Sequence, residues 1–134
     1  HNLGEGLAIG SAYAIGSLAL GAALIVGFAL HNATEGLAIV APVASEKRRP
    51  SFLIGLGLLA GAPAVLGAWL GASAYDPTLA ALMFGIGAGA IARVIVQIAP
   101  SIRDRAGALL HPMAATGILT GIVVMYVTGL LVAV

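Results

Sequence analysis

Long apolar stretches alternate with short polar segments along the chain. A helix needs roughly 20 mostly apolar residues to cross a hydrocarbon layer of about 30 Å. Three stretches in the later part of the chain meet this requirement. They are 51–74, 77–92 with its continuation past Arg93, and 109–134. We therefore predict three membrane-spanning helices in the segment that follows Pro50.

The segment before these stretches is expected to form two antiparallel helices. One continuous helix from His1 to Lys47 would be about 70 Å long at 1.5 Å per residue, which is about two bilayer crossings. Gly16 and Ser17 favour a reversal of the chain within this segment. The sequence thus predicts the all-α class, as a polytopic transmembrane helix bundle with about five spans in a single membrane domain. The expected spans are roughly 1–16, 20–43, 51–74, 78–99 and 110–133.

The composition is typical of a membrane protein, because 60% of the residues are hydrophobic and only 8% are charged. The net charge of +1 gives no reason to expect nucleic acid as a partner. The chain has no cysteine, which excludes thiolate metal sites and disulfides. The expected partners are the lipid bilayer and a divalent metal ion, with a homodimer left open.

The loop cations indicate how the bundle is oriented. With the spans given above, successive loops lie on alternate sides of the membrane, and every loop Lys or Arg falls on one side. These residues are Lys47, Arg48, Arg49, Arg103 and Arg105. Cytoplasmic loops carry an excess of Lys and Arg. We therefore expect a multi-pass protein of the cell membrane, a prokaryotic inner or plasma membrane, with these loops in the cytoplasm and the C-terminus outside.

Pairs of glycines four residues apart recur in the apolar stretches. Small residues at this spacing let helix backbones approach closely in lipid, so we expect these pairs to contribute packing and no chemistry. They are Gly6/Gly10, Gly57/Gly61, Gly67/Gly71, Gly85/Gly89 and Gly117/Gly121.

A polar motif, H-N-x-x-E-G, occurs twice in these apolar surroundings, as HNLGEG at 1–6 and as HNATEG at 31–36. Its His and Glu are one helical turn apart and share a face of the helix. The two copies are nearly equidistant from the expected reversal at Gly16 and Ser17, so they should lie opposite each other near the middle of the membrane. A carboxylate at this depth costs at least about 2.5–3.5 kcal/mol, so two of them need a counter-charge or protons.

A divalent cation would supply this counter-charge. Imidazole nitrogen, amide oxygen and carboxylate oxygen together form a donor set that suits zinc, iron(II), manganese or cobalt. The predicted ligands are His1, Asn2, Glu5, His31, Asn32 and Glu35. Alternatively, protonated glutamates could hydrogen-bond to His and Asn and only fix the pairing of the helices. The repetition of the motif favours the metal site.

The paired motifs resemble the signature sequences on the fourth and fifth helices of the ZIP (Zrt/Irt-like) metal transporters. The resemblance covers the whole chain as helices four to eight of an eight-span fold. It implies a transporter rather than an enzyme. Such a transporter carries a divalent metal toward the cytoplasm as its substrate and has no cofactor. Zinc is the first candidate, followed by iron, manganese, cobalt and cadmium. Because the chain starts inside a motif at His1, we expect it to be the C-terminal part of a longer protein.

The chain departs from the family pattern at several positions. Many prokaryotic members have proline before the motif glutamate, where this chain has Gly4 and Thr34. Many members also have a glutamate on the sixth helix, where this chain has Ala64. Gln97 stands where several relatives have carboxylates; we expect its amide to face the membrane interface, with a weak contact on the exit path of the metal as the alternative. The missing carboxylates lead us to expect one bound metal rather than two.

Two other function classes remain open. A proton- or ion-translocating hairpin, like the proteolipids of rotary rings, carries one buried carboxylate, but it gives the twin His and Asn residues no role. An intramembrane metalloenzyme would need an open metal position and a general base, and the chain has no H-E-x-x-H motif. Metal-dependent uptake into vesicles would separate the transporter from both.

Overall fold

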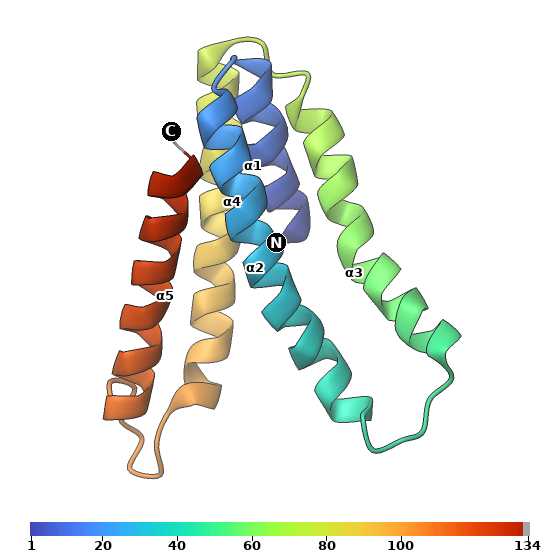
Figure 1. Cartoon of the computed structure of the whole chain (residues 1–134), viewed down its shortest axis with the longest axis vertical. Helices are drawn as coiled ribbons and strands as arrows, with labels where there is room; N and C mark the ends of the chain where they lie inside the picture. Colours follow the sequence, from blue (N-terminus) through green and yellow to red (C-terminus); the bar gives the residue numbers. More distant parts are fainter. Residues whose placement is uncertain (133–134) are drawn as a thin grey trace.

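The computed structural model describes residues 1–132 and forms a bundle of helices with short connections (Figure 1). The helices are α1 (Asn2–Ala14), α2 (Leu18–Val40), α3 (Pro50–Gly71), α4 (Pro77–Ile98) and α5 (Pro112–Val132). Short 3₁₀ turns, Ala41–Val43 and Ala99–Ile102, follow α2 and α4. No strand occurs within residues 1–132. The expected all-α class is confirmed.

Four helical segments are long and apolar enough to cross a membrane. They are Leu18–Val43, Pro50–Gly71, Pro77–Ile102 and Pro112–Leu131. The remaining helix, α1, has 13 residues. It is about 20 Å long at 1.5 Å per residue, which is shorter than a hydrocarbon layer of about 30 Å. Length and composition thus support four of the five expected spans. The expected span 110–133 reaches one residue beyond the described part of the chain.

Proline marks the start of each of the three later helices. Pro50, Pro77 and Pro112 are the first residues of α3, α4 and α5. The first helical position suits proline because its missing N–H would have no partner within the helix. At α4, Asp76 adds a side-chain cap, since its Oδ1 accepts hydrogen bonds from the Thr78 and Leu79 nitrogens over 2.9 and 3.1 Å. These signals explain why the helices begin within a residue or two of the expected positions.

The predicted reversal between the first two helices is confirmed. Gly16 has a φ of +77°, a backbone conformation that side chains with a Cβ rarely adopt. The turn is closed by hydrogen bonds from the Gly16 nitrogen to the Tyr13 carbonyl and from the Ser17 nitrogen to the Ala12 carbonyl. α1 and α2 therefore run antiparallel and side by side (Figure 1).

The most buried helix is α1, which packs against α2, α3 and α4. Glycines on both helices let α1 and α3 bring their backbones close together. A Cβ added at Gly6 would lie 2.7 Å from the Ala68 nitrogen, and one added at Gly71 would lie 2.9 Å from the Ser11 nitrogen. Such close backbone approach stabilises helix pairs in lipid, where apolar side chains gain little from leaving their surroundings.

The glycine pairs expected to pack therefore have two outcomes. Gly6/Gly10 and Gly67/Gly71 each lie against the backbone of the opposite helix at the α1–α3 contact, as predicted. The other three pairs have open space where a Cβ would be added, within the described helices, so their expected packing is wrong for this part of the chain. These pairs are Gly57/Gly61, Gly85/Gly89 and Gly117/Gly121.

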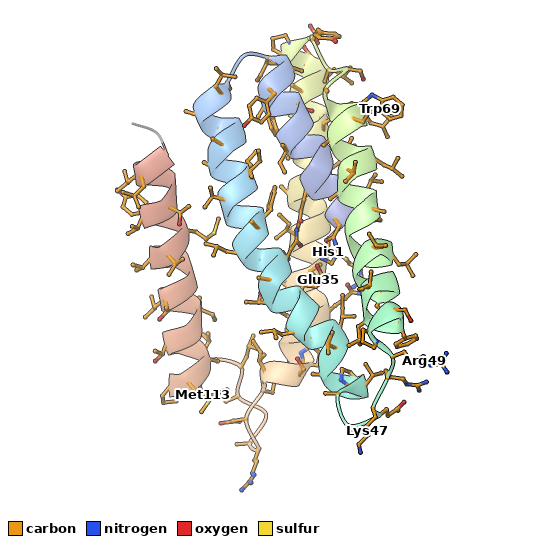
Figure 2. All side chains as sticks on the ribbon, turned by 45° about the vertical axis from the view of Figure 1, so that its right-hand side comes forward. His1, Glu35, Lys47, Arg49, Trp69 and Met113 are labelled. Carbon is orange, nitrogen blue, oxygen red and sulfur yellow. The ribbon has the colours of Figure 1, made fainter. Side chains whose placement is uncertain are left out.

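The connections gather at two opposite ends of the bundle. The turns after α1 and after α3 lie at one end, and those after α2 and after α4 lie at the other (Figure 1). The second end, which we call the basic end, contains all the loop cations. They are Lys47, Arg48, Arg49, Arg103 and Arg105. Figure 2 shows Lys47 and Arg49 there, so the predicted segregation of loop charge to one end is confirmed.

Candidate metal centre

The two motifs meet between α1 and α2. The first motif forms the start of α1, and the second lies in the half of α2 nearer the basic end. Because the two helices are antiparallel, the reversal at Gly16 brings the motifs to the same level, as their equal spacing from it predicted. Figure 2 shows His1 and Glu35 next to each other at this level.

Each histidine pairs with the glutamate of the other motif. His1 Nε2 lies 3.1 Å from Glu35 Oε1, and His31 Nε2 lies 3.5 Å from Glu5 Oε1. The two imidazole rings are edge to face, with ring centres 5.8 Å apart and an angle of 78° between their planes. The pairs thus cross between the helices, so four side chains form one cluster.

Three members of this cluster are arranged so that they could share one ion. His1, Glu5 and His31 each offer a ligand atom within 4.8 Å of the other two. Two imidazole nitrogens and one carboxylate oxygen are a donor set that zinc commonly accepts. Glu35 adjoins this trio through His1 rather than belonging to it.

Glu5 is the deepest part of the cluster. Its side chain is fully buried, and its Oε2 accepts a hydrogen bond of 3.1 Å from Asn32 Nδ2. Gly4 and Gly6 on either side let α1 lie close to α4 and α3, which excludes other groups from that side. A carboxylate in such surroundings needs a compensating cation or proton.

Four buried polar atoms of the two motifs have no hydrogen-bond partner in the described part of the chain. They are Asn2 Oδ1, Glu5 Oε1, His31 Nε2 and Asn32 Oδ1. Buried polar atoms are normally hydrogen-bonded, so several unpartnered atoms in one place require an explanation. All four can donate electron pairs to a cation. The predicted ligand residues therefore fit a metal ion.

Two cavities adjoin the cluster on opposite sides of α2. The α2/α3 cavity has a volume of about 180 Å³ and is lined by Asn2, Asn32 and Glu35. Its remaining lining is glycine, alanine and larger apolar residues. The α2/α4 cavity, of about 360 Å³, is lined by His1, Glu35 and Gln97, among others. Among the six predicted ligands, Glu35 is the one that lines both cavities.

Three sequence expectations concern residues beside the motifs. Ala64 lies opposite Gly6, at the level of the cluster, and its methyl group offers no ligand atom. Within the described helices Glu5 and Glu35 are the only acidic residues, which agrees with the expected lack of further carboxylates. Gln97 is exposed, and it also lines the α2/α4 cavity with His1, so both interpretations of Gln97 stay open.

Sequence reasoning missed the contact between the first motif and α3. Asn2 Nδ2 donates a hydrogen bond of 2.8 Å to the carbonyl oxygen of Ala60. The residue type at position 60 gives no signal of this bond, because every residue has a carbonyl. The one signal in the sequence is Pro63, which lies inside α3 three residues later.

The geometry and the motif resemblance are the basis for interpreting this cluster. No family model, curated protein or solved structure matches the chain.

Proposed function

We propose that the protein is a membrane transporter of divalent transition-metal ions, zinc foremost, of the ZIP-like type. The observation that carries this proposal is the crossing of the His–Glu pairs. Buried atoms at the crossing can donate electron pairs to a cation and have no hydrogen-bond partner in the described part of the chain. The principal ligands are His1, Glu5 and His31, with Glu35 at the edge of the site.

The charge and chemistry of the cluster favour a divalent transition metal over other cations. Glu5 and Glu35 together neutralise a 2+ ion, which lowers the cost of placing carboxylates at this depth. The imidazoles of His1 and His31 favour borderline metals such as zinc over magnesium or calcium, which prefer all-oxygen sites. One ion is expected, because a second 2+ charge nearby would need further carboxylates.

The surroundings of the cluster favour transport over a purely structural metal site. Structural zinc sites are closed, with four protein ligands. Here two cavities adjoin the cluster, and 22% of the Glu35 side chain is exposed. A transporter presents a site near the middle of the membrane to each side in turn. We assign the basic end to the cytoplasm by the excess of loop cations. The resemblance to the ZIP transporters implies that the ion moves toward that end.

Zinc uptake into proteoliposomes tests this function. The reconstituted protein is expected to take up zinc, and Glu5→Gln is expected to abolish this uptake, because it removes the buried carboxylate from the trio. Glu46→Gln is the matched control, since Glu46 is an exposed residue of the loop after α2. Its uptake should equal that of the parent.

Other outcomes of the same assay would contradict the proposal. Equal uptake by Glu5→Gln and by the parent would remove the cluster from the transport path. Proton flux without any metal movement would favour the proteolipid-like alternative. Parallel measurements with iron, manganese, cobalt and cadmium rank the substrates.

A further inference from the structure

The two motif asparagines occupy equivalent positions in the sequence but have different hydrogen-bond partners. Asn32 Nδ2 donates to Glu5 Oε2 over 3.1 Å, within the cluster. Asn2 Nδ2 donates instead to the Ala60 carbonyl oxygen on α3, over 2.8 Å. Both acceptors are oxygen atoms without a hydrogen, so each asparagine presents its NH₂ group to them. Asn2 is 8% exposed, so its hydrogen bond is shielded from water.

The Ala60 carbonyl lies in the turn of α3 that leads to Pro63. Proline has no N–H to donate to the carbonyl four residues earlier, which is that of Leu59, and its ring crowds the preceding turn. In membrane helices, neighbouring helices and polar side chains satisfy the backbone groups that a proline loosens. Asn2 donates from α1 to the Ala60 carbonyl, which is next to that of Leu59 in the same turn.

This contact lies where α3 changes its neighbours. Toward the end opposite the basic end, Gly67 and Gly71 bring α3 against the backbone of α1. Toward the basic end, α3 extends past the start of α1, as Figure 1 shows. The α2/α3 cavity lies in this second half, and both Asn2 and Ala60 line it. Asn2 thus joins the first motif to the turn of α3 at which the close packing ends.

We propose that Asn2 is a positioning residue, which holds His1 and Glu5 in place by donating a hydrogen bond to the Ala60 carbonyl at the Pro63 turn. The inference rests on the proposed metal site. It gives α3 a part in metal binding, although α3 contains no His, Asp or Glu. The same bond fixes the direction of Asn2 Oδ1, which is buried and has no hydrogen-bond partner in the described chain.

The substitution Asn2→Asp separates positioning from ligation. It keeps the shape of the side chain and an oxygen atom for an ion, but it removes the NH₂ donor and sets a carboxylate oxygen against the Ala60 carbonyl. Zinc affinity, measured by equilibrium titration of the purified protein, is expected to fall about tenfold, as on loss of a partner that orients a metal ligand. Unchanged or tighter zinc binding would overturn the proposal, because Asn2 would then act as a ligand.

Pro63→Ala tests the same link with both motifs intact. We expect it to weaken zinc binding about threefold by itself, because it changes the turn that accepts the Asn2 bond. Pro50→Ala is the matched control, since Pro50 is the first residue of the same helix and should leave the affinity unchanged. Equal affinity of the parent and Pro63→Ala would contradict the proposal even if Asn2→Asp does not fold.

The two changes should also depend on each other. In the Pro63→Ala protein, Asn2→Asp is expected to lower the zinc affinity by a clearly smaller factor than in the parent, because part of the interaction is already lost. The same fold-change in both backgrounds would refute the positioning role alone. A parent protein that binds no zinc would instead refute the proposed function, so the two failures are distinguishable.

Discussion

Replacing Gly67 by alanine tests whether the close contact of α1 and α3 holds the cluster of His and Glu side chains in place. A Cβ added at Gly67 would overlap the Leu3 carbonyl oxygen and lie 2.9 Å from the Leu7 nitrogen. Both are backbone atoms of α1, which cannot turn aside as the end of a flexible side chain can. The two helices must therefore separate. Leu3 is part of the first motif, so the separation displaces the ligands next to it.

The expected size of the effect follows from this overlap. Carbon atoms in contact prefer separations of about 3.5–4.0 Å, so the helices must part by on the order of 1 Å. Overpacking of this kind costs about 1–3 kcal/mol. Replacing a glycine within a helix by alanine stabilises the helix by roughly 0.5–1 kcal/mol, so the net loss is at most about 2.5 kcal/mol. Metal–ligand distances tolerate only about 0.2 Å, so zinc affinity should fall by more than about tenfold.

Thermal unfolding and zinc titration of the purified protein measure the two effects. Gly57→Ala is the matched control, because Gly57 lies in the same helix and an added Cβ there meets nothing within 4 Å. We expect Gly67→Ala to lower both the melting temperature and the zinc affinity, and Gly57→Ala to lower neither. Equal behaviour of the two variants would refute the reasoning.

Three further predictions concern the cluster and the orientation of the bundle. Zinc binding should weaken as the pH falls from about 7.5 to 5, because His and Glu must release their protons before they coordinate a metal; titration at several pH values checks this, and flat binding would count against a His/Glu site. Glu35→Gln should reduce zinc affinity less than Glu5→Gln does, because Glu35 lies outside the trio; equal losses in titration would contradict this difference. Because the chain has no cysteine of its own, Lys47→Cys and Asp76→Cys can be labelled in intact cells. We expect Lys47→Cys to react only from the cytoplasm and Asp76→Cys from outside. The reverse pattern would overturn the orientation.

The features that follow from spacing along the chain were predictable. The reversal at Gly16 and the equal distance of the motifs from it are properties of the sequence, and they bring His1 and Glu35 to one level. The starts of the later helices were also predictable, because proline at the first helical position is a local signal. In each case a residue type and a distance along the chain determine the result.

The features that depend on the rotation of one helix against another were not predictable. Spacing places His1 and Glu5 on one face, but it does not say that each will pair with the other motif. Five glycine pairs share the same spacing, and only the packing decides that Gly6/Gly10 and Gly67/Gly71 lie against a neighbouring helix backbone. The Asn2 bond depends on a carbonyl oxygen, which every residue has, so its position on α3 could not be read from residue types.

The central claim is that a single metal ion binds between α1 and α2, held by the cluster of crossing His–Glu pairs. Anomalous diffraction at the zinc edge, from crystals soaked in zinc, tests it most directly. We predict one peak within about 2.0–2.2 Å of ligand atoms of His1, Glu5 and His31. The absence of a peak at this position, or two peaks bridged by Glu5 and Glu35, would contradict the account.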